Sequence, residues 1–582
     1  MRTYYGSLVR KRAKVTVALF ALWFIVILIR LVQLQVLEHP RLKSEVLDQN
    51  RNRITLQPQR GRILDRNGTV LAVSLPVQSV FYSPHGSVAP AEMRGTLDRL
   101  GEVLNLSERE KAALLQRVAD GHPFSWIKRK IDDDTAARVS ALALKGVYLQ
   151  EERERFYPQG HLAAHVLGGV DIDGNGQAGI EYQYNDILRG ETGERLILRD
   201  AKRRGYHIET IRQALPGRDI TLTLDAAIQY YAETELGKAV FEHGAEWGTV
   251  ILSDPYTGDI LAMANTPTYD PNRFPPQGGA GINRAVRYLF EPGSTFKIVS
   301  AAAALEDHVL EPHELFDCRS GSISIGGTTI RDHKTFGVLS FPEVLIHSSN
   351  VGTALFGRRV GENRLYQTIR DFGFGEKTRS GLPAEEAGIC RTPDKWHISS
   401  LSYLSIGYEI SVTALQVLQA MNVFATGGYL VRPRVVRTFG DPDLDAGLVP
   451  PPVKVISAET ASTLTDIWIR AVAEGTGRPA RLSGFSVAGK TGTAQIFDPE
   501  KRTYRSSRHR ASFVGFVPAE DPIFSMVVVI SEPKGDLRYG GQVAAPVFRD
   551  IAVRVLRHLR IAPHPDPHPG LISVSLQSEN IP

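Results

Sequence analysis

Three short stretches stand in order along the chain: Ser294-Thr295-Phe296-Lys297, Ser348-Ser349-Asn350 and Lys490-Thr491-Gly492-Thr493. Serine hydroxyls and lysine amines serve as nucleophile and base in acyl-transfer sites. The first pattern, Ser-x-x-Lys, is weak by itself because it recurs at Ser125…Lys128 and at Ser531…Lys534. The three stretches together, in this order, predict a serine acyl-transfer site.

The surroundings of Ser294 distinguish it from the other two matches. It follows the turn Glu291-Pro292-Gly293 and precedes an apolar, alanine-rich run, which is typical of the first turns of a buried helix. A spacing of three places Ser294 and Lys297 on one helical face. Lysine can take a proton from serine only if burial or another cation lowers its pKa, and Lys490 is the candidate cation. Backbone N–H groups at the helix start point toward the developing oxyanion.

The Lys490-Thr491-Gly492-Thr493 stretch occurs once. Its flanking residues, 485–489 and 494–495, favour an extended edge strand. We expect this strand to pair with a peptide substrate, and Gly492 to let the backbone of the ligand lie close.

The same set of three motifs is found in penicillin-binding proteins and class A β-lactamases. Further segments resemble class B penicillin-binding proteins over nearly the whole chain. Segments similar to the non-catalytic pedestal are Arg60-Gly61-Arg62-Ile63-Leu64-Asp65-Arg66-Asn67-Gly68, Tyr157-Pro158-Gln159-Gly160 and Gly179-Ile180-Glu181. Residues 262–272, Tyr539-Gly540-Gly541 and residues 544–548 resemble the transpeptidase domain of the cell-division branch.

The resemblance implies a D,D-transpeptidase that cross-links peptidoglycan in the septum and is inhibited by β-lactams. Ser294 would attack the penultimate D-Ala carbonyl of a stem peptide ending in D-Ala-D-Ala, with Lys297 as general base. Ser348 and Asn350 would relay protons and hold the substrate amide, and Lys490 and Thr491 would bind the substrate carboxylate. The backbone N–H groups of Ser294 and Thr493, beside Gly492, would form the oxyanion hole. We expect no cofactor.

The N-terminal region predicts a membrane anchor at residues 15–37. Residues 15–29 carry no charge, and residues 31–37 extend the apolar stretch past Arg30 to a length that spans a bilayer. No small-x-small cleavage site follows, which argues against a signal peptide. Five basic and no acidic residues in the tail 1–14 place the N-terminus in the cytoplasm and the rest of the chain outside it.

The anchor also suggests partners. Arg30 and Gln33 lie within its distal end, where unpaired polar groups are costly and face protein or the interface. The family resemblance implies a SEDS-type glycosyltransferase and other division proteins beside it. Snorkelling of Arg30 to the headgroups explains that residue equally well.

The remaining chain predicts an α+β organisation. Residues 38–216 form the pedestal (dimerisation-type) domain, residues 219–562 a serine β-lactamase-like domain with an antiparallel sheet flanked by helices, and the proline-rich residues 563–582 a disordered tail. The net charge of +5 is small and the basic residues are scattered, which argues against nucleic-acid binding. We interpret Cys318 and Cys390 as free buried thiols, because no metal-ligand spacing surrounds them. A calcium-loop pattern begins at Asp171, but Tyr182 occupies the position where such a loop needs its closing glutamate.

Several alternatives remain at this stage. A β-lactamase needs neither the anchor nor the pedestal, and a bifunctional class A enzyme needs a glycosyltransferase domain that the space before Asp219 cannot hold. A catalytically idle scaffold or β-lactam sensor conflicts with the complete motif set. An elongation-type class B enzyme is the nearest rival, because the division assignment depends on the flanking motifs alone.

Overall fold

The computed structural model describes residues 2–39, 41, 51–83, 90–122, 124–199, 205–498, 500 and 503–563. The chain forms two compact units, one of residues 1–59 with 190–216 and one of residues 60–189 with 217–582. Of the tail predicted to be disordered, residues 563–582, all but Pro563 lie outside the described residues.

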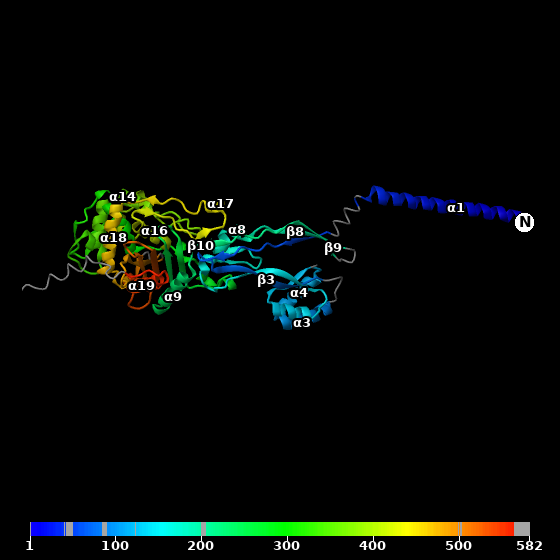
Figure 1. The fold of residues 1–582 in the computed structure, drawn as a ribbon, viewed down its shortest axis with the longest axis horizontal. Helices are drawn as coiled ribbons and strands as arrows, with labels where there is room; N and C mark the ends of the chain where they lie inside the picture. The colour runs from blue at the N-terminus through cyan, green and yellow to red at the C-terminus, as the bar shows by residue number, and fades with distance from the viewer. Residues whose placement is uncertain are drawn as a thin grey trace, which may run out of the picture. The chain divides into compact units, whose positions relative to one another are not determined.

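The first unit contains the apolar N-terminal helix. Helix α1 (Arg2–Val32) continues into a π-helical turn, η1 (Gln33–Leu37) (Figure 1). The helical stretch Arg10–Leu37 contains an 18-residue window with a mean hydropathy of 2.7 and no buried residues. Its 28 residues extend about 42 Å, more than the roughly 30 Å of a bilayer core. At its end, the Arg30 guanidinium donates to Gln33 Oε1 (2.8 Å) and Gln33 Nε2 donates to Glu38 Oε1 (2.7 Å). These polar groups therefore satisfy one another.

The same unit contains a three-stranded antiparallel sheet. Its strands are β1 (Arg51–Leu56), β8 (Gly193–Arg199) and β9 (Gly205–Arg212), in the order β1-β8-β9.

The second unit begins with the pedestal sheet. Its strands are β2 (Ile63–Leu64), β3 (Val70–Tyr82), β4 (Ser125–Ile131) and β5 (Val147–Phe156), with β5 paired to β3. Helices α3 (Pro90–Leu104), α4 (Glu108–Ala119) and α5 (Asp133–Ala141) pack on it through a core that includes Val80, Leu97 and Ile127. Strand β2 also pairs with β10 (Ile220–Leu222), which pairs with β18 (Val436–Thr438). The pedestal sheet thus continues into strands of the following domain.

Short elements connect the pedestal to that domain: α6 (Ala164–Leu167), β6 (Gly169–Val170), β7 (Gly176–Ala178), α7 (Gly179–Gln183) and α8 (Asn185–Arg189). Glu181 lies at their centre with no exposed side-chain surface. It accepts hydrogen bonds from Arg60 Nε (2.7 Å) and Arg155 Nε (2.6 Å). The pedestal motifs at Arg60 and Glu181 therefore meet in one buried ion-pair network.

The large domain is built on a five-stranded antiparallel sheet in the order β12-β11-β22-β21-β20. The strands are β11 (Trp247–Ser253), β12 (Ile260–Thr266), β20 (Ala488–Asp498), β21 (Thr503–Val517) and β22 (Phe524–Ser531). Strands β11 and β12 pair as an antiparallel hairpin, and every residue of β22 is buried. Strand β20, which carries the Lys490 motif, lies at the edge, as predicted.

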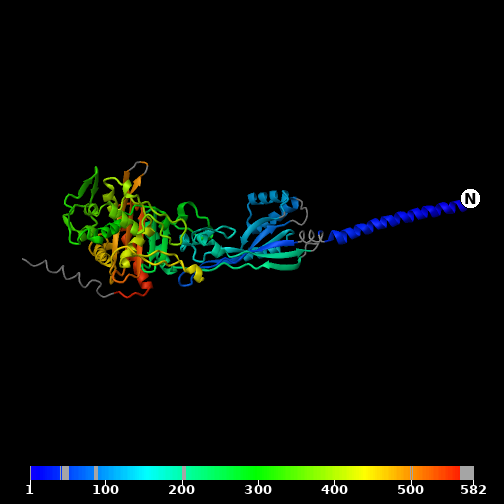
Figure 2. The same cartoon turned by 90° about the horizontal axis from the view of Figure 1, so that it is seen from above.

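Both faces of this sheet are buried, and alternate residues enter different cores. Val250, Val528 and Ile530 face one core with helices α9 (Ala226–Glu242) and α19 (Gly540–His558). Ile251 and Val527 face the other core, with α11 (Lys297–Leu305), α16 (Ala414–Ala425) and α18 (Ala458–Ala473). Figure 2 shows the orange strands enclosed by helices. The predicted α+β fold, an antiparallel sheet flanked by helices, is confirmed.

This domain contains further short strands and helices. They are α10 (Arg284–Arg287), β13 (Leu315–Asp317), β14 (Ser322–Ile325), β15 (Thr328–Arg331), β16 (Val338–Ser340), α12 (Phe341–Ile346), α13 (Asn350–Val360), α14 (Glu362–Asp371), α15 (Ser400–Ser405), β17 (Tyr429–Leu430), α17 (Pro442–Asp445) and β19 (Val453–Lys454).

Candidate active site

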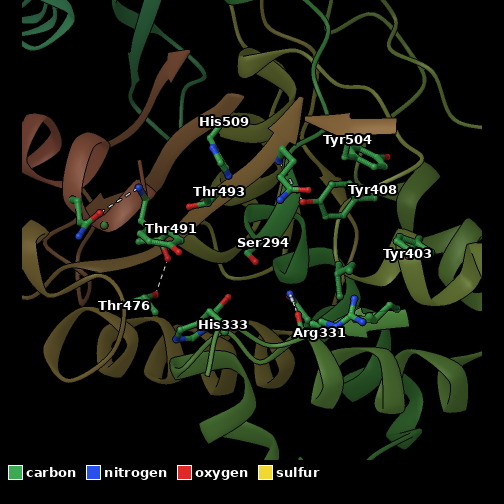
Figure 3. A pocket seen from close by; sticks show the side chains of 18 of the residues that line it. Ser294, Arg331, His333, Tyr403, Tyr408, Thr476, Thr491, Thr493, Tyr504 and His509 are labelled. Carbon is green, nitrogen blue, oxygen red and sulfur yellow. Dashed lines mark hydrogen bonds between the residues drawn. The ribbon is translucent and has the colours of Figure 1, made fainter. Parts of the chain in front are cut away.

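The three motifs line one cavity of about 760 Å³ (Figure 3). Ser294 stands in a single 3-10 turn, η4 (Gly293–Phe296), that leads directly into α11. Ser348 and Asn350 lie at the start of α13, and Thr491 and Thr493 lie on β20. The structure therefore brings together residues that are up to about 200 positions apart in the sequence.

Lys297 is fully buried at the first position of α11. Its amine donates to the Ser348 carbonyl (2.8 Å), the Ser349 carbonyl (3.1 Å) and Asn350 Oδ1 (2.8 Å). The Ser348 hydroxyl lies 3.4 Å away. Lys297 thus connects the first motif to the second.

Lys490 is also fully buried, on β20. Its amine donates to the Ser348 hydroxyl (2.9 Å) and to the Thr491 carbonyl (3.0 Å). The Ser348 hydroxyl is consequently within reach of both lysine amines, which is the arrangement that a proton relay needs.

Both lysines have lowered pKa values. Burial lowers the pKa of Lys297 well below that of a free lysine, and the positive charge of Lys490 lowers it further, whereas Asp332 opposes this shift. Burial alone lowers the pKa of Lys490 to about 7. The sequence prediction that burial and a second cation act on Lys297 therefore agrees with the structure.

Our sequence analysis did not identify Asp332 as a site residue. In the structure, its carboxylate holds the residues of the second motif in place. Its carboxylate accepts from the Ser349 hydroxyl (2.8 Å), from the Asn350 N–H and from the Val351 N–H (3.1 Å) at the N-terminus of α13. Ser348 just before them has a φ of +57°, in the left-handed region that costs energy for a non-glycine residue. The contacts of Asp332 fix the turn that holds Ser348 in this conformation.

The free edge of β20 faces the cavity. The N–H of Gln495 donates to the Tyr408 hydroxyl (3.4 Å), outside the sheet. Because N–H directions alternate along an antiparallel strand, the N–H of Thr493, two residues earlier, also points to the unpaired side. The unpaired side is that of η4, since the Thr493 carbonyl lies beside Gly293, next to Ser294.

The requirement for glycine at position 492 differs from our prediction. A Cβ on Gly492 would lie 2.4 Å from Ser512 Oγ and 2.8 Å from Thr295 Cγ2. The missing side chain therefore makes room for neighbouring residues of the protein, not for the backbone of a ligand. This glycine lets β20 pack against η4 and so sets the position of the strand beside Ser294.

Aromatic side chains that the sequence did not identify form one end of the cavity. Tyr403, Tyr408 and Tyr504 line it, and Tyr408 and Tyr504 meet edge to face with ring centroids 5.2 Å apart. The Tyr504 hydroxyl donates to Glu291 (2.9 Å). Tyrosines scattered over a hundred residues carry no local sequence signal, which is why pattern analysis missed them.

The competing Ser-x-x-Lys matches lie elsewhere. Ser125 is buried in β4, and Lys128 donates to the Leu104 carbonyl. Ser531 is buried at the end of β22, and none of these residues lines the cavity.

The two cysteines are unpaired. Cys318 is buried, as predicted, and Cys390 is only half-buried, because it lies in an irregular segment at the surface.

Comparison with known proteins identifies the family. The penicillin-binding protein transpeptidase domain matches residues 248–552, and the penicillin-binding protein dimerisation domain matches residues 55–222. The two domains in this order define a class B penicillin-binding protein. The chain belongs to this family.

Named relatives agree with this assignment. The chain is 36% identical to the probable peptidoglycan D,D-transpeptidase PenA of Neisseria meningitidis serogroup A over 535 residues, which cover 89% of this chain and 88% of that protein. It is 33% identical to the peptidoglycan D,D-transpeptidase FtsI of Escherichia coli K12, covering 87% and 84%. The crystal structure of penicillin-binding protein 3 of Mycobacterium tuberculosis complexed with ampicillin has a TM-score of 0.68 and 29% identity, covering 89% and 98%.

Proposed function

We propose that the protein is a membrane-anchored peptidoglycan D,D-transpeptidase that acts through a Ser294 acyl-enzyme, in septal wall synthesis. The observation that carries the proposal is that Ser294, Ser348 and strand β20 line one cavity, while two buried lysine amines lie within reach of the Ser348 hydroxyl. Stem peptides are the substrate, and β-lactams, which mimic their D-Ala-D-Ala end, trap the same serine.

In this mechanism Lys297 is the general base. Its lowered pKa favours the free amine that a base requires. Ser294 attacks the carbonyl of the penultimate D-Ala, and the Ser294 and Thr493 N–H groups stabilise the oxyanion. The orientation of the Thr493 N–H toward the unpaired edge of β20 supports this role.

The remaining motif residues handle protons and substrate. The Ser348 hydroxyl, 2.9 Å from Lys490 and 3.4 Å from Lys297, relays a proton to the departing D-Ala. Asn350 holds the substrate amide, and Lys490 with Thr491 binds the terminal carboxylate. A bound carboxylate favours the charged form of Lys490 because opposite charges at close range raise the pKa of a lysine. An amine from a neighbouring stem then resolves the acyl-enzyme.

The domain assignment is part of the proposal. Residues 1–14 form a cytoplasmic tail, 15–37 the transmembrane anchor, 38–216 the pedestal, 219–562 the transpeptidase domain and 563–582 a disordered tail. The apolar helix at Arg10–Leu37 and the family matches at residues 55–222 and 248–552 support these bounds. The basic residues before the anchor support a cytoplasmic N-terminus and an extracytoplasmic catalytic domain.

Covalent labelling tests the chemistry. A fluorescent penicillin should label the purified protein, and Ser294→Ala should abolish the label. Ser125→Ala and Ser531→Ala serve as matched controls and should keep it. Labelling of Ser294→Ala together with its loss in either control would contradict the choice of nucleophile.

Depletion of the protein from cells tests the septal role. Filaments support division, and rounded cells support the second candidate, an elongation-type class B transpeptidase. The division assignment rests on the resemblance of residues 262–272, of Tyr539-Gly540-Gly541 and of residues 544–548 to the division branch.

Exchange of the membrane anchor tests the proposed glycosyltransferase partner. We propose that it packs beside a SEDS-type glycosyltransferase and other division proteins. Exchange of residues 15–37 for an unrelated membrane helix should keep penicillin labelling but impair septal synthesis and co-purification with the glycosyltransferase. Normal division after the exchange would indicate that the helix only tethers the enzyme.

A further inference from the structure

The cavity has two ends on opposite sides of Ser294. Thr491 and Thr476 lie on one side, and Arg331, Tyr403 and Tyr504 lie on the other (Figure 3). In the proposed function, on which this inference rests, Thr491 binds the terminal carboxylate of the donor stem. The part of the donor that precedes the attacked D-Ala must then extend toward Arg331 and the tyrosines.

Among the described residues, the walls of the cavity carry one arginine and two histidines. These are Arg331, His333 and His509, and no aspartate or glutamate of the part of the chain that the structure describes lines the cavity. Burial is the main cause that lowers the pKa of both histidines, which favours their neutral form. The guanidinium of Arg331 is therefore the wall group that stays fully charged.

The guanidinium of Arg331 has no acidic partner within the described ranges of the chain. The carboxylate next to it in sequence, Asp332, accepts instead from the N-terminal residues of α13. Arg331 is exposed and open to the cavity. An arginine without an internal partner at the wall of a substrate cavity is available to bind an anionic group of the substrate.

The backbone contacts of Arg331 determine which part of the donor stem peptide its side chain can reach. Its carbonyl accepts from Asn350 Nδ2 (3.0 Å), and it ends β15, whose neighbouring residue Ile330 is buried. Asn350 is the residue that holds the substrate amide in the proposed mechanism. The Arg331 side chain consequently starts beside the peptide unit that precedes the attacked D-Ala.

We propose that Arg331 is a specificity-determining residue that binds a side-chain carboxylate of the donor stem, on the N-terminal side of the attacked D-Ala. Stem peptides can carry two such groups, the α-carboxylate of a γ-linked D-glutamate and the second carboxylate of a diamino dicarboxylic acid. Both groups offer the planar pair of oxygens that a guanidinium binds with two parallel N–H···O hydrogen bonds. Amidation of the bound carboxylate removes this interaction.

The test measures kcat/KM for D-Ala release by the purified full chain in detergent. Three synthetic pentapeptide stems are compared: one with both carboxylates free, one amidated at the glutamate and one amidated at the diamino acid. We expect the wild type to prefer the free carboxylate over at least one amide by about tenfold or more, as for a charge-assisted hydrogen bond. Arg331→Gln should reduce that preference to within about twofold, and Arg331→Lys should retain part of it.

Arg319→Gln is the matched control. Arg319 is an exposed arginine of the same domain that pairs with Asp317 at 2.7 Å and does not line the cavity. This variant should keep the wild-type preference, which separates direct binding from a general loss of positive charge. The preference compares substrates on one variant, so a partly folded preparation does not alter it.

The outcomes are distinguishable. Sensitivity to one amidation identifies which carboxylate Arg331 binds. D-Ala release without preference in the wild type, or a preference that survives Arg331→Gln, overturns the proposal for Arg331 alone. Failure of the wild type to release D-Ala from all three peptides overturns the proposed function and this proposal with it.

Discussion

Substitution of Asp332 by asparagine separates the positioning of the second motif from its electrostatics. Asparagine has nearly the same shape, and its amide oxygen can still accept from the start of α13, but the negative charge is lost. In the wild type the carboxylate accepts from the Ser349 hydroxyl and from two backbone N–H groups, and its charge acts on Lys297. We therefore expect two effects of different sign.

The first effect is a loss of rate and stability. Three charge-assisted hydrogen bonds become neutral ones or are lost, each worth about 1 kcal/mol less. Because Asp332 is only half-buried, we expect about 1–3 kcal/mol less unfolding free energy. We expect acylation by penicillin to fall about 10- to 100-fold at its pH optimum, which corresponds to about 1.4–2.7 kcal/mol.

The second effect is a shift of the acidic limb of the pH profile. As general base Lys297 must be a free amine, so acylation rises as pH passes through its pKa. Asp332 raises that pKa, against burial and Lys490. Removal of the charge should therefore move the acidic limb to lower pH, although the rate at the optimum falls.

Stopped-flow acylation between pH 4 and 9 would measure both effects. Asp317→Asn is the control, since this exposed aspartate of the same domain pairs with Arg319. If the acidic limb of the acylation pH profile stays in place or moves to higher pH, Asp332 does not act on Lys297 through its charge. Its role would then be structural only.

Three further substitutions test other parts of the argument. Lys297→Arg keeps a cation that cannot accept a proton at neutral pH. Penicillin acylation should therefore fall by about 10²–10⁴-fold while the circular dichroism spectrum stays native. Near-normal acylation would mean that another residue is the general base. Gly492→Ala places a Cβ 2.4 Å from Ser512 Oγ and should displace β20 and slow acylation about tenfold or more; an unchanged rate would mean that the strand position is not critical. Glu181→Ala leaves Arg60 without its buried partner and should lower the unfolding free energy by about 3–5 kcal/mol in denaturant titrations; a loss below about 1 kcal/mol would contradict the network's importance.

The sequence could predict what is encoded by local pattern. Ser294 and Lys297 are three residues apart on one turn, and the motif at Lys490 lies in a stretch whose extended character is evident from its neighbours. The apolar run at residues 15–37 is also a local signal. These features predicted the anchor, the edge position of β20 and the pairing of Ser294 with Lys297. The roles of Ser348, Asn350 and Thr491 came from the resemblance to penicillin-binding proteins.

Asp332 and Arg331 could not be found in this way. Their importance depends on where β15 meets the start of α13, a tertiary contact that no periodicity of the sequence records. The interpretation of Gly492 failed for a related reason. A glycine in a strand indicates that something approaches closely, but only the structure identifies that neighbour as Thr295 and Ser512 and not a ligand.

The chemistry of the base follows from the architecture of the core. All nine residues of α11 are buried, including Lys297 at its first position. A helix on a protein surface would leave the lysine hydrated, and its pKa would stay near 10.4, far too high for a base at neutral pH. Here α11 lies in the core between the sheet and the outer helices, and β20 places Lys490 beside it. The lowered pKa of both lysines therefore depends on the core packing that removes their amines from water.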